Sequence, residues 1–223
     1  MNSEGYTAPA ALAVDAVVLA VRDERLSALV VRREDGASGL PGGFVGPDER
    51  PDDTAMRKLR EKTGLEQAYL EQLGAFADPK RDPRGWIPSI AYMALVPHVT
   101  EPADPNARWI PARGRHRLAY DHRAILATAV ERLEGNLWWS NVAVGFLPGE
   151  FTMTDARHVY EAVGDTHYDP ATFARDLKAT GLVVATGERR ADGPGRPAAL
   201  YRFASATKAW GAGHRKRVAT RAR

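Results

Sequence analysis

The segment GFVGPDERPDDTAMRKLREKTGL, residues 43–65, decides how the first half of this chain folds. It joins a loop rich in glycine and proline, which begins at Gly36, to a helical segment over residues 52–63. Working outward, segments with the apolar pattern of strands cover residues 13–22, 26–34, 67–78 and 87–96. The order strand, strand, loop, helix, strand, strand predicts a mixed sheet flanked by helices.

Seven residues of this segment stand at the spacing of a known signature. In words, the signature is Gly, five residues, Glu, seven residues, then Arg-Glu-aliphatic-any-Glu-Glu-any-Gly-aliphatic, and the segment resembles it in a loop–helix–loop context. The matching residues are Gly43, Glu49, Arg57, Leu59, Glu61, Gly64 and Leu65. The resemblance to the Nudix family implies an N-terminal α/β/α sandwich with a mixed sheet, and an ion pair of Glu49 with Arg57 that ties loop to helix.

The segment departs from the Nudix signature at the positions that carry its chemistry. A working Nudix hydrolase presents three carboxylates on one helix face, which hold divalent cations and prepare a water for attack. Here that face reads Lys58, Glu61, Lys62, so two ammonium groups replace two metal ligands. We therefore expect no metal and no catalytic residue, with hydrolysis lost or very weak. The face either binds phosphates directly or is an ordinary exposed helix surface of alternating charge.

Loss of the metal does not remove the capacity to bind a nucleotide. A nucleoside diphosphate is anionic, and basic side chains can replace the missing metal charge. Trp86 follows the loop DPKRDPRG, residues 78–85, and either stacks on a base or packs in the core or rim. The candidate effector-binding residues are Arg32, Arg33, Arg57, Lys58, Glu61, Lys62 and Trp86.

A helix is expected at the end of the first domain, where it serves as a connector or as a dimer face. Residues 97–120 are irregular, and Asp121 then stands where it can N-cap a helix over residues 121–137. Apolar residues recur every four positions along this helix, at Ile125, Ala129, Leu133 and Leu137. We expect a Nudix-like domain over 1–148 that ends with this helix, a second domain over 149–206, and a basic, disordered tail over 207–223.

The pattern of the second domain is that of a winged helix-turn-helix. Thr154 can N-cap a helix that runs to about Val163, and Asp169 with Pro170 starts another that Gly181 ends. Two short strands, residues 182–188 and 198–203, flank the loop RRADGPGRP. The fold class is therefore α+β: a Nudix-like sandwich followed by a winged helix.

Basic side chains on this second domain point to DNA. Phe173 and Leu177 lie four apart and should pack inward, which leaves the opposite face of the helix free for the major groove. The candidate DNA-binding residues are Thr154, Thr172, Arg175, Lys178, Arg189, Arg190 and Arg196. A single amphipathic helix with a charged face is commonly just a surface helix, but a basic wing beside it favours DNA binding.

Together the two halves resemble the Nudix-related transcriptional regulators, from about Ala13 to Phe203. The resemblance implies a homodimeric repressor of NAD-biosynthesis or salvage genes, which ADP-ribose or a related nucleotide releases from palindromic double-stranded operator DNA. Two alternatives stay open: an ADP-ribose or nucleotide-sugar pyrophosphatase with an appended domain, and a pentose-utilisation regulator that senses a sugar phosphate.

Composition agrees with a DNA-binding regulator and excludes several other classes. Of 223 residues, 44% are hydrophobic and 26% charged, and none is cysteine, which excludes disulfides and thiolate metal sites. Residues 1–149 carry 18 basic and 20 acidic side chains, whereas residues 150–223 carry 13 and 8, so positive charge gathers in the last third. No signal peptide, transit peptide or membrane span is evident, and we expect a soluble, cytoplasmic protein.

Overall fold

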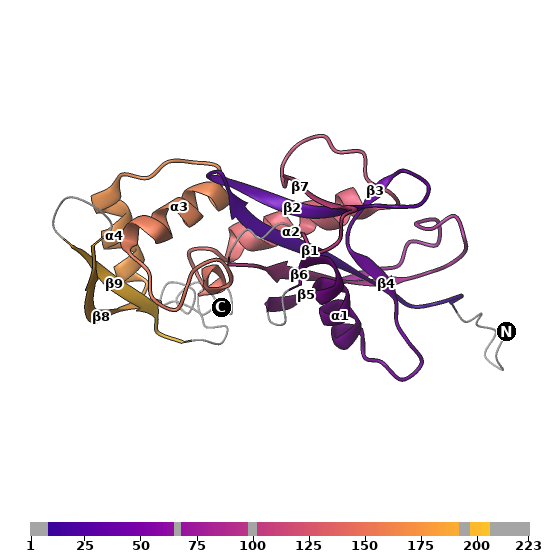
Figure 1. Cartoon of the computed structure of the whole chain (residues 1–223), viewed down its shortest axis with the longest axis horizontal. Coiled ribbons are helices and arrows are strands. Elements are labelled where there is room, and N and C mark those ends of the chain that lie inside the picture. The colour runs from indigo at the N-terminus through magenta and orange to yellow at the C-terminus, as the bar shows by residue number, and fades with distance from the viewer. Residues whose placement is uncertain (1–8, 65–67, 98–101, 192–196, 206–223) are drawn as a thin grey trace, which may run out of the picture. The chain divides into compact units, whose positions relative to one another are not determined.

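The computed structural model describes residues 9–64, 68–97, 102–191 and 197–205, and it contains two compact units (Figure 1). The first comprises Met1–Ala20 and Ser27–Ala129, and the second comprises Val21–Leu26 and Val130–Arg223. The division therefore falls inside the helix α2 (His122–Asn136), whereas the sequence suggested a domain limit after residue 148. The limits 1–148, 149–206 and 207–223 stay a prediction, and the tail from residue 206 lies outside the described residues.

A mixed sheet forms the framework of the first unit. The strands along its path are ordered β3 (Ser38–Gly39), β2 (Arg25–Arg32), β1 (Ala13–Arg22), β6 (Ser89–Leu95) and β5 (Tyr69–Phe76). β4 (Gly42–Phe44) also pairs with β1, and β7 (Ala107–Pro111) pairs with β2. β1 and β6 run parallel at the centre, and their apolar runs are buried on both faces, as expected for inner strands.

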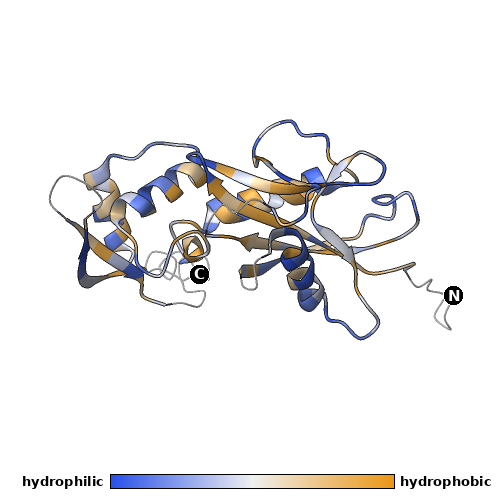
Figure 2. Ribbon diagram, in the orientation of Figure 1, coloured by the Kyte–Doolittle hydropathy of each residue, from blue (hydrophilic) through white to orange (hydrophobic). Residues whose placement is uncertain are grey.

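Helices cover the two faces of the sheet. α1 (Pro51–Thr63) places its buried Leu59 against the β1 face that carries Ala16, Val18 and Ala20. Successive side chains of a strand alternate between faces, so Asp15 points the other way, where it meets His122 at the start of α2. The predicted α/β/α arrangement is confirmed, and Figure 2 shows hydrophobic colour concentrated along the central strands.

The sequence missed three short strands. β3 and β4 lie inside the glycine-rich loop, and β7 lies inside the stretch 97–120 that was interpreted as irregular. β3 and β4 have only two and three residues, which are too few to show the alternation of apolar and polar side chains that marks a strand. β7 ends in a proline, which is typical of an edge strand. The turn Asp23-Glu24 was predicted correctly, and both residues have positive φ, 45° and 60°, as a tight hairpin requires.

The second unit is a winged helix. After a short 3₁₀ turn (Val142–Gly145), it contains α3 (Met153–Gly164), α4 (Pro170–Ala179) and the antiparallel strands β8 (Val183–Arg190) and β9 (Ala198–Phe203). Its small core is aromatic: Trp138, Tyr160 and Phe173 meet edge to face with ring centroids 4.9–5.5 Å apart. Helix, helix and two-stranded wing agree with the prediction.

The start of α3 corrects one prediction. The N-cap is Thr152 rather than Thr154: its side chain accepts a hydrogen bond from the backbone N–H of Asp155, whose carboxylate accepts one from the N–H of Thr152. This reciprocal capping box fixes the register of the helix two residues earlier than expected. Thr154 is consequently an exposed residue of the first turn. At α4, the predicted Asp169 cap is confirmed by its 2.9 Å bond from the N–H of Thr172.

No helix in the described ranges is both long enough and apolar enough to cross a membrane.

Candidate effector pocket and DNA-binding surface

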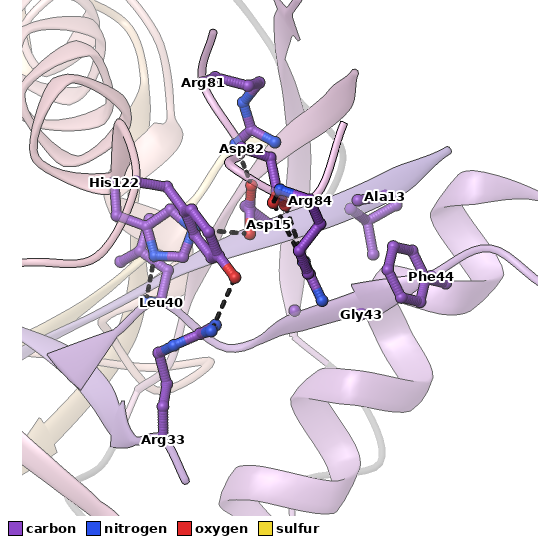
Figure 3. A pocket seen from close by; sticks show the side chains of 13 residues that line it. Ala13, Asp15, Arg33, Leu40, Gly43, Phe44, Arg81, Asp82, Arg84 and His122 are labelled. Carbon is purple, nitrogen blue, oxygen red and sulfur yellow. Dashed lines mark hydrogen bonds and ion pairs between the residues drawn. The ribbon is translucent and has the colours of Figure 1, made fainter. Parts of the chain in front are cut away.

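A pocket of about 170 Å³ opens in the first unit where five separate segments meet (Figure 3). The segments are the start of β1, the residue that follows β2, the glycine loop with β4, the loop that follows β5, and the residues just before and at the start of α2. Glycine is required on the loop side, because a Cβ at Gly42 would lie 2.4 Å from the carbonyl oxygen of Val14 and 2.8 Å from Oδ1 of Asp15. The loop therefore approaches β1 backbone to backbone.

A buried ion-pair network forms the floor of this pocket. Asp15 and Arg81 are 6% and 8% exposed, and Nη2 of Arg81 donates to Oδ2 of Asp15 over 3.0 Å. Arg81 also binds Asp121, because its Nε and Nη2 donate to the two carboxylate oxygens over 2.9 and 2.7 Å. Its Nη1 donates to the carbonyl oxygen of Ile87 over 3.1 Å. Because every charged atom here has a partner, the network can remain buried.

His122 completes the floor as a neutral imidazole. Its Nδ1 lies 2.8 Å from the backbone nitrogen of Leu40 and accepts that N–H, so Nδ1 carries no proton. The proton is therefore on Nε2, which faces Oδ1 of Asp15 at 3.2 Å and donates to it. Burial raises the pKa of Asp15, but the hydrogen bond from His122 and the charge of Arg81 outweigh burial and hold that pKa below its ordinary value.

Arginines and aromatic rings alternate along the pocket wall. The guanidinium of Arg33 lies 4.5 Å from the ring centroid of Tyr120, while Nη2 of the same residue donates to the Tyr120 hydroxyl over 2.7 Å. Arg84 lies between two rings, 5.2 Å from the centroid of Phe44 and 5.6 Å from that of Tyr120. Asp82 accepts from Arg84 over 2.7 Å and holds the guanidinium in this position. The wall offers cationic groups and flat apolar surfaces together.

The Nudix helix α1 carries an ion-pair cluster of its own. Arg57 binds Glu49 through two hydrogen bonds of 2.8 and 2.7 Å, as the sequence predicted, and donates to Oε1 of Glu61 over 3.0 Å. Lys58 donates to Oε2 of Glu61 over 2.8 Å. Lys62 pairs with Asp104 over 2.5 Å.

These residues do not fit a divalent cation. Both oxygens of Glu61 and both oxygens of Glu49 already accept from cationic side chains, and Lys58 and Lys62 stand where the Nudix signature has carboxylates. Within the described ranges, no group of three or more histidine, aspartate or glutamate side chains is arranged to hold a metal ion. The donor set of the described residues is that of an ion-pair network.

The predicted effector residues divide into those that reach the pocket and those that do not. Arg33 lines it, and the stem of Lys58 lies against Gly43 on its rim, where a Cβ would sit 2.7 Å from Cε. Arg32 is exposed, and Trp86, 42% exposed, donates its indole N–H to the carbonyl of Ala77 over 3.3 Å. The remaining three, Arg57, Glu61 and Lys62, belong to the ion pairs of α1.

Sequence reasoning missed most of the pocket. Among the missed residues are those with charged or aromatic side chains: Asp15, Phe44, Arg81, Asp82, Arg84, Tyr120 and His122. Two signals pointed to them: Asp15 interrupts an apolar strand, and the arginines belong to the loop DPKRDPRG. The segments come together only in three dimensions, so neither signal identified a site.

The face of α4 expected to read DNA is exposed as predicted. Phe173 and Leu177 are buried at 1% and 0% exposure, while Thr172, Arg175 and Lys178 are exposed. Nε of Arg175 pairs with Oδ1 of the adjacent Asp176 over 2.9 Å, and Nζ of Lys178 lies 5.2 Å from the ring centroid of Tyr201. This surface combines a packed face and a basic face on one helix, which is what insertion in a major groove needs.

The wing arginines differ from one another in their surroundings. Arg190 binds Oδ2 of Asp155 over 2.8 Å, so it ties β8 to the N-terminus of α3. Arg189 is exposed and donates to the carbonyl of Pro197 across the wing. Arg196 lies outside the described residues. Contact of any of these side chains with DNA stays a prediction.

A Nudix domain that carries a pocket with a cationic and aromatic wall, followed by a winged helix, defines a class of ligand-responsive DNA-binding regulators. Residues 11–133 match the model of the NUDIX domain, and residues 143–203 match that of the NrtR DNA-binding winged helix domain. The "ADPR responsive transcriptional repressor NtrR" of Acinetobacter baylyi is 31% identical over 205 residues, which are 86% of this chain and 82% of that protein. This chain belongs to the NrtR family of transcriptional regulators.

Two further relatives bear on the pocket. Shewanella oneidensis NrtR in complex with a 27mer DNA is 33% identical, with a TM-score of 0.73 over 86% of this chain and 93% of that one. Its isolated NUDIX domain in complex with ADP-ribose is 34% identical, with a TM-score of 0.50 over 60% of this chain and 94% of that one. An ADP-ribose pyrophosphatase of Methanocaldococcus jannaschii is 31% identical over 52% of this chain and 70% of that protein.

Proposed function

We propose that this protein is a cytoplasmic repressor of NAD-biosynthesis or salvage genes, that it binds operator DNA as a homodimer, and that ADP-ribose in the pocket of the first unit releases it. One observation carries the proposal. The Nudix unit keeps a pocket with a cationic and aromatic wall, while Glu49 and Glu61 of its Nudix segment are already bound by arginine and lysine. Such a unit is built to hold a nucleotide without cutting it, and the winged helix on the same chain is the element that can report occupancy.

The pocket wall suits the parts of ADP-ribose. Its diphosphate would pair with the guanidinium groups of Arg33 and Arg84, because planar arginines bind phosphate oxygens in pairs. A pocket of about 170 Å³ is smaller than the roughly 300–1,000 Å³ that encloses a whole ligand of this size. The remainder of the ligand would therefore lie across the mouth, where Phe44 is 48% exposed and offers a face for a base.

A titration in both directions tests the response. The DNA probe is the tightest-binding duplex recovered by the full-length protein from a random-sequence library, called the operator duplex below. ADP-ribose is titrated into the protein with and without saturating operator duplex, and the expected ratio of the two Kd values is ~5–150. Linkage requires that saturating ADP-ribose weaken operator binding by the same factor. Equal Kd values in the two titrations would contradict the proposed response.

Ribose 5-phosphate serves as the comparison ligand in the same titration. It carries the sugar and one phosphate but no base. A response to ribose 5-phosphate without a response to ADP-ribose would favour regulation by a pentose phosphate instead. Arg33→Ala should weaken binding of ADP-ribose, whereas Arg32→Ala, a matched change at the exposed neighbour, should leave it within about twofold.

Hydrolysis is the second candidate function, and the similarity to an ADP-ribose pyrophosphatase favours it. The two functions separate in one incubation of the protein with ADP-ribose and Mg²⁺ or Mn²⁺, with AMP and ribose 5-phosphate measured as products. We expect no turnover that exceeds the uncatalysed rate. Release of AMP at an enzymatic rate, on the order of 1 s⁻¹ or faster, would establish a pyrophosphatase.

A further inference from the structure

The floor of the pocket and the first turn of α2 form one closed ring of interactions. Asp15 receives Nε2–H of His122 on Oδ1, at 3.2 Å, and Nη2–H of Arg81 on Oδ2, at 3.0 Å. Arg81 in turn holds both carboxylate oxygens of Asp121, at 2.9 and 2.7 Å. Asp121 and His122 are neighbours in the chain, so the peptide bond between them closes the ring. We call these four residues the α2 ring.

The α2 ring fixes the helix at its beginning. His122 is the first residue of α2, and the carbonyl of Asp121 accepts from the N–H groups of Ala124 and Ile125 over 2.8 and 3.1 Å. A rotation of the first turn would therefore break contacts to Asp15 on β1. Arg81, Asp15 and His122 are each less than a tenth exposed, so water does not readily replace a lost partner.

The same ring faces the ligand space. Asp15, Arg81 and His122 line the pocket, whereas Asp121 is outside its lining (Figure 3). The glycine loop also contacts the α2 ring. The N–H of Leu40 donates to Nδ1 of His122, and a Cβ at Gly39 would lie 3.1 Å from that nitrogen. A molecule that donates to or accepts from these groups must rearrange the bonds that hold the start of α2.

α2 continues out of this unit. Its residues as far as Ala129 belong to the first compact unit, and those from Val130 onward belong to the second, which contains the winged helix. The helix is continuous from His122 to Asn136, so it joins the α2 ring to residues of the second unit along one element of regular structure.

We propose that the α2 ring is the device by which the pocket reports occupancy to the winged helix, with Asp121 and His122 as positioning residues. The inference rests on the proposed function, because it needs a ligand that alters DNA binding. While its hydrogen bonds are intact, the ring holds α2 in one orientation. Ligand groups that compete for Asp15 or His122 favour a second orientation, and the difference in ligand affinity between the two orientations is the coupling.

The test uses Asp121→Asn in the full-length protein. Asparagine is as good a helix N-cap residue as aspartate, so the change removes the charge bound to Arg81 while leaving the helix start intact. The quantity measured is the coupling factor, the Kd of ADP-ribose with saturating operator duplex divided by the Kd without it. We expect ~5–150 for the wild type and a value within about twofold of 1 for Asp121→Asn, with both ligands still bound.

Two further variants complete the test, one as a control and one as a second change in the α2 ring. Thr128→Ala, at a half-buried position of the same helix where the hydroxyl donates to the carbonyl of Ala124, should retain the wild-type factor. His122→Asn keeps an acceptor for the N–H of Leu40 but cannot reach Asp15, so it should lower the factor even if Asp121→Asn fails to fold. A wild-type factor retained in both ring variants overturns the inference. A wild-type factor of 1 instead overturns the proposed function, which distinguishes the two failures.

Discussion

Charge at single residues determines what α1 can do. Lys58 and Lys62 replace two carboxylates of the Nudix signature. Lys58 forms an ion pair with Glu61, and Lys62 forms one with Asp104. The hydrogen bond from Lys58 lowers the pKa of Glu61, and the hydrogen bond from Lys62 lowers that of Asp104. The face that binds cations in a hydrolase is thus neutralised from within the chain.

Reversing that replacement should restore affinity for a metal ion. In the double variant Lys58→Glu with Lys62→Glu, repulsion among carboxylates lowers the Tm without metal, and millimolar Mg²⁺ raises it by relieving that repulsion. The measurement is thermal unfolding with and without Mg²⁺. Lys58→Gln with Lys62→Gln removes the same ion pairs but adds no carboxylates, so its Tm should not respond to Mg²⁺. Equal responses of the two double variants would contradict this account of the helix face.

The Glu49–Arg57 pair should make the unfolding free energy of the first unit depend on pH in the acidic range. Hydrogen bonds from Arg57 lower the pKa of Glu49 from 4.5 to about 2. Because the pKa is depressed in the folded state, the pair stabilises the fold above about pH 4.5, and this contribution is lost as pH falls toward 2. Glu49→Gln should flatten the pH dependence of the unfolding free energy in this range, whereas Asp48→Asn on the same loop should not. Denaturant unfolding at stepped pH measures the difference.

At the scale of elements, the N-terminus of α3 joins helix and wing. The carboxylate of Asp155 accepts from the N–H of Thr152 and from Arg190 on β8. Burial raises the pKa of Asp155, but these two hydrogen bonds outweigh it and leave that pKa below its ordinary value. One side chain therefore caps the helix and holds the wing strand.

Arg190 and Arg189 should consequently respond differently to truncation. Arg190→Ala removes the partner of Asp155 and should lower the unfolding free energy of the winged helix by ~0.2–1 kcal/mol, because the pair is about a third exposed. Arg189→Ala is expected to leave stability within error and to weaken binding to all DNA sequences alike, with a salt slope smaller by about 1. Thermal unfolding and DNA binding at several salt concentrations separate the two roles; identical profiles would contradict them.

Helix α4 should carry the sequence preference. Arg175→Ala should weaken operator binding by ~1–3 kcal/mol and blur the preference at one position of each half-site, as loss of a base contact does. Asp176→Asn should instead strengthen binding, because it removes a negative charge and frees Nε of Arg175. Binding to a set of operator duplexes that each carry one base change measures both effects. An Arg175→Ala variant with unchanged affinity and preference would place the reading face elsewhere.

Elements with a strong local signal could be predicted from the sequence, and long-range geometry could not. The apolar run of β1, the Asp169-Pro170 start of α4 and the Glu49–Arg57 pair each depend on spacing within one segment. The α3 cap was misplaced by two residues because Thr152 and Thr154 are both capable caps and only the reciprocal bond to Asp155 decides between them. The α2 ring joins positions 15, 81, 121 and 122, and no periodicity relates such distant residues.

At the scale of the whole molecule, one winged helix offers too little to recognise an operator alone. α4 exposes three candidate reading residues, Thr172, Arg175 and Lys178, which can contact only a few base pairs. Single DNA-binding modules bury roughly 600–1,000 Å² of protein surface, whereas specific complexes commonly bury about 1,000–2,500 Å². In the proposed homodimer a second copy of the chain would supply the missing contacts, which is the physical reason for proposing a homodimer on a palindromic site.

The proposed homodimer predicts how operator binding depends on the spacing of half-sites. Two recognition helices fixed in one dimer must meet successive major grooves on the same face of the duplex, ~34–36 Å apart. Inserting about 5 base pairs between the half-sites turns one of them to the opposite face, and affinity should fall toward that of a single half-site. Inserting about 10 base pairs returns the second half-site to the original face but moves it one helical turn farther away. If the two recognition helices are held at a fixed separation, affinity should therefore stay low. Anisotropy titrations with the three duplexes measure this. Affinity that is indifferent to both insertions would mean that each chain binds its half-site independently, and ADP-ribose would then have to act within one winged helix rather than on the separation of two.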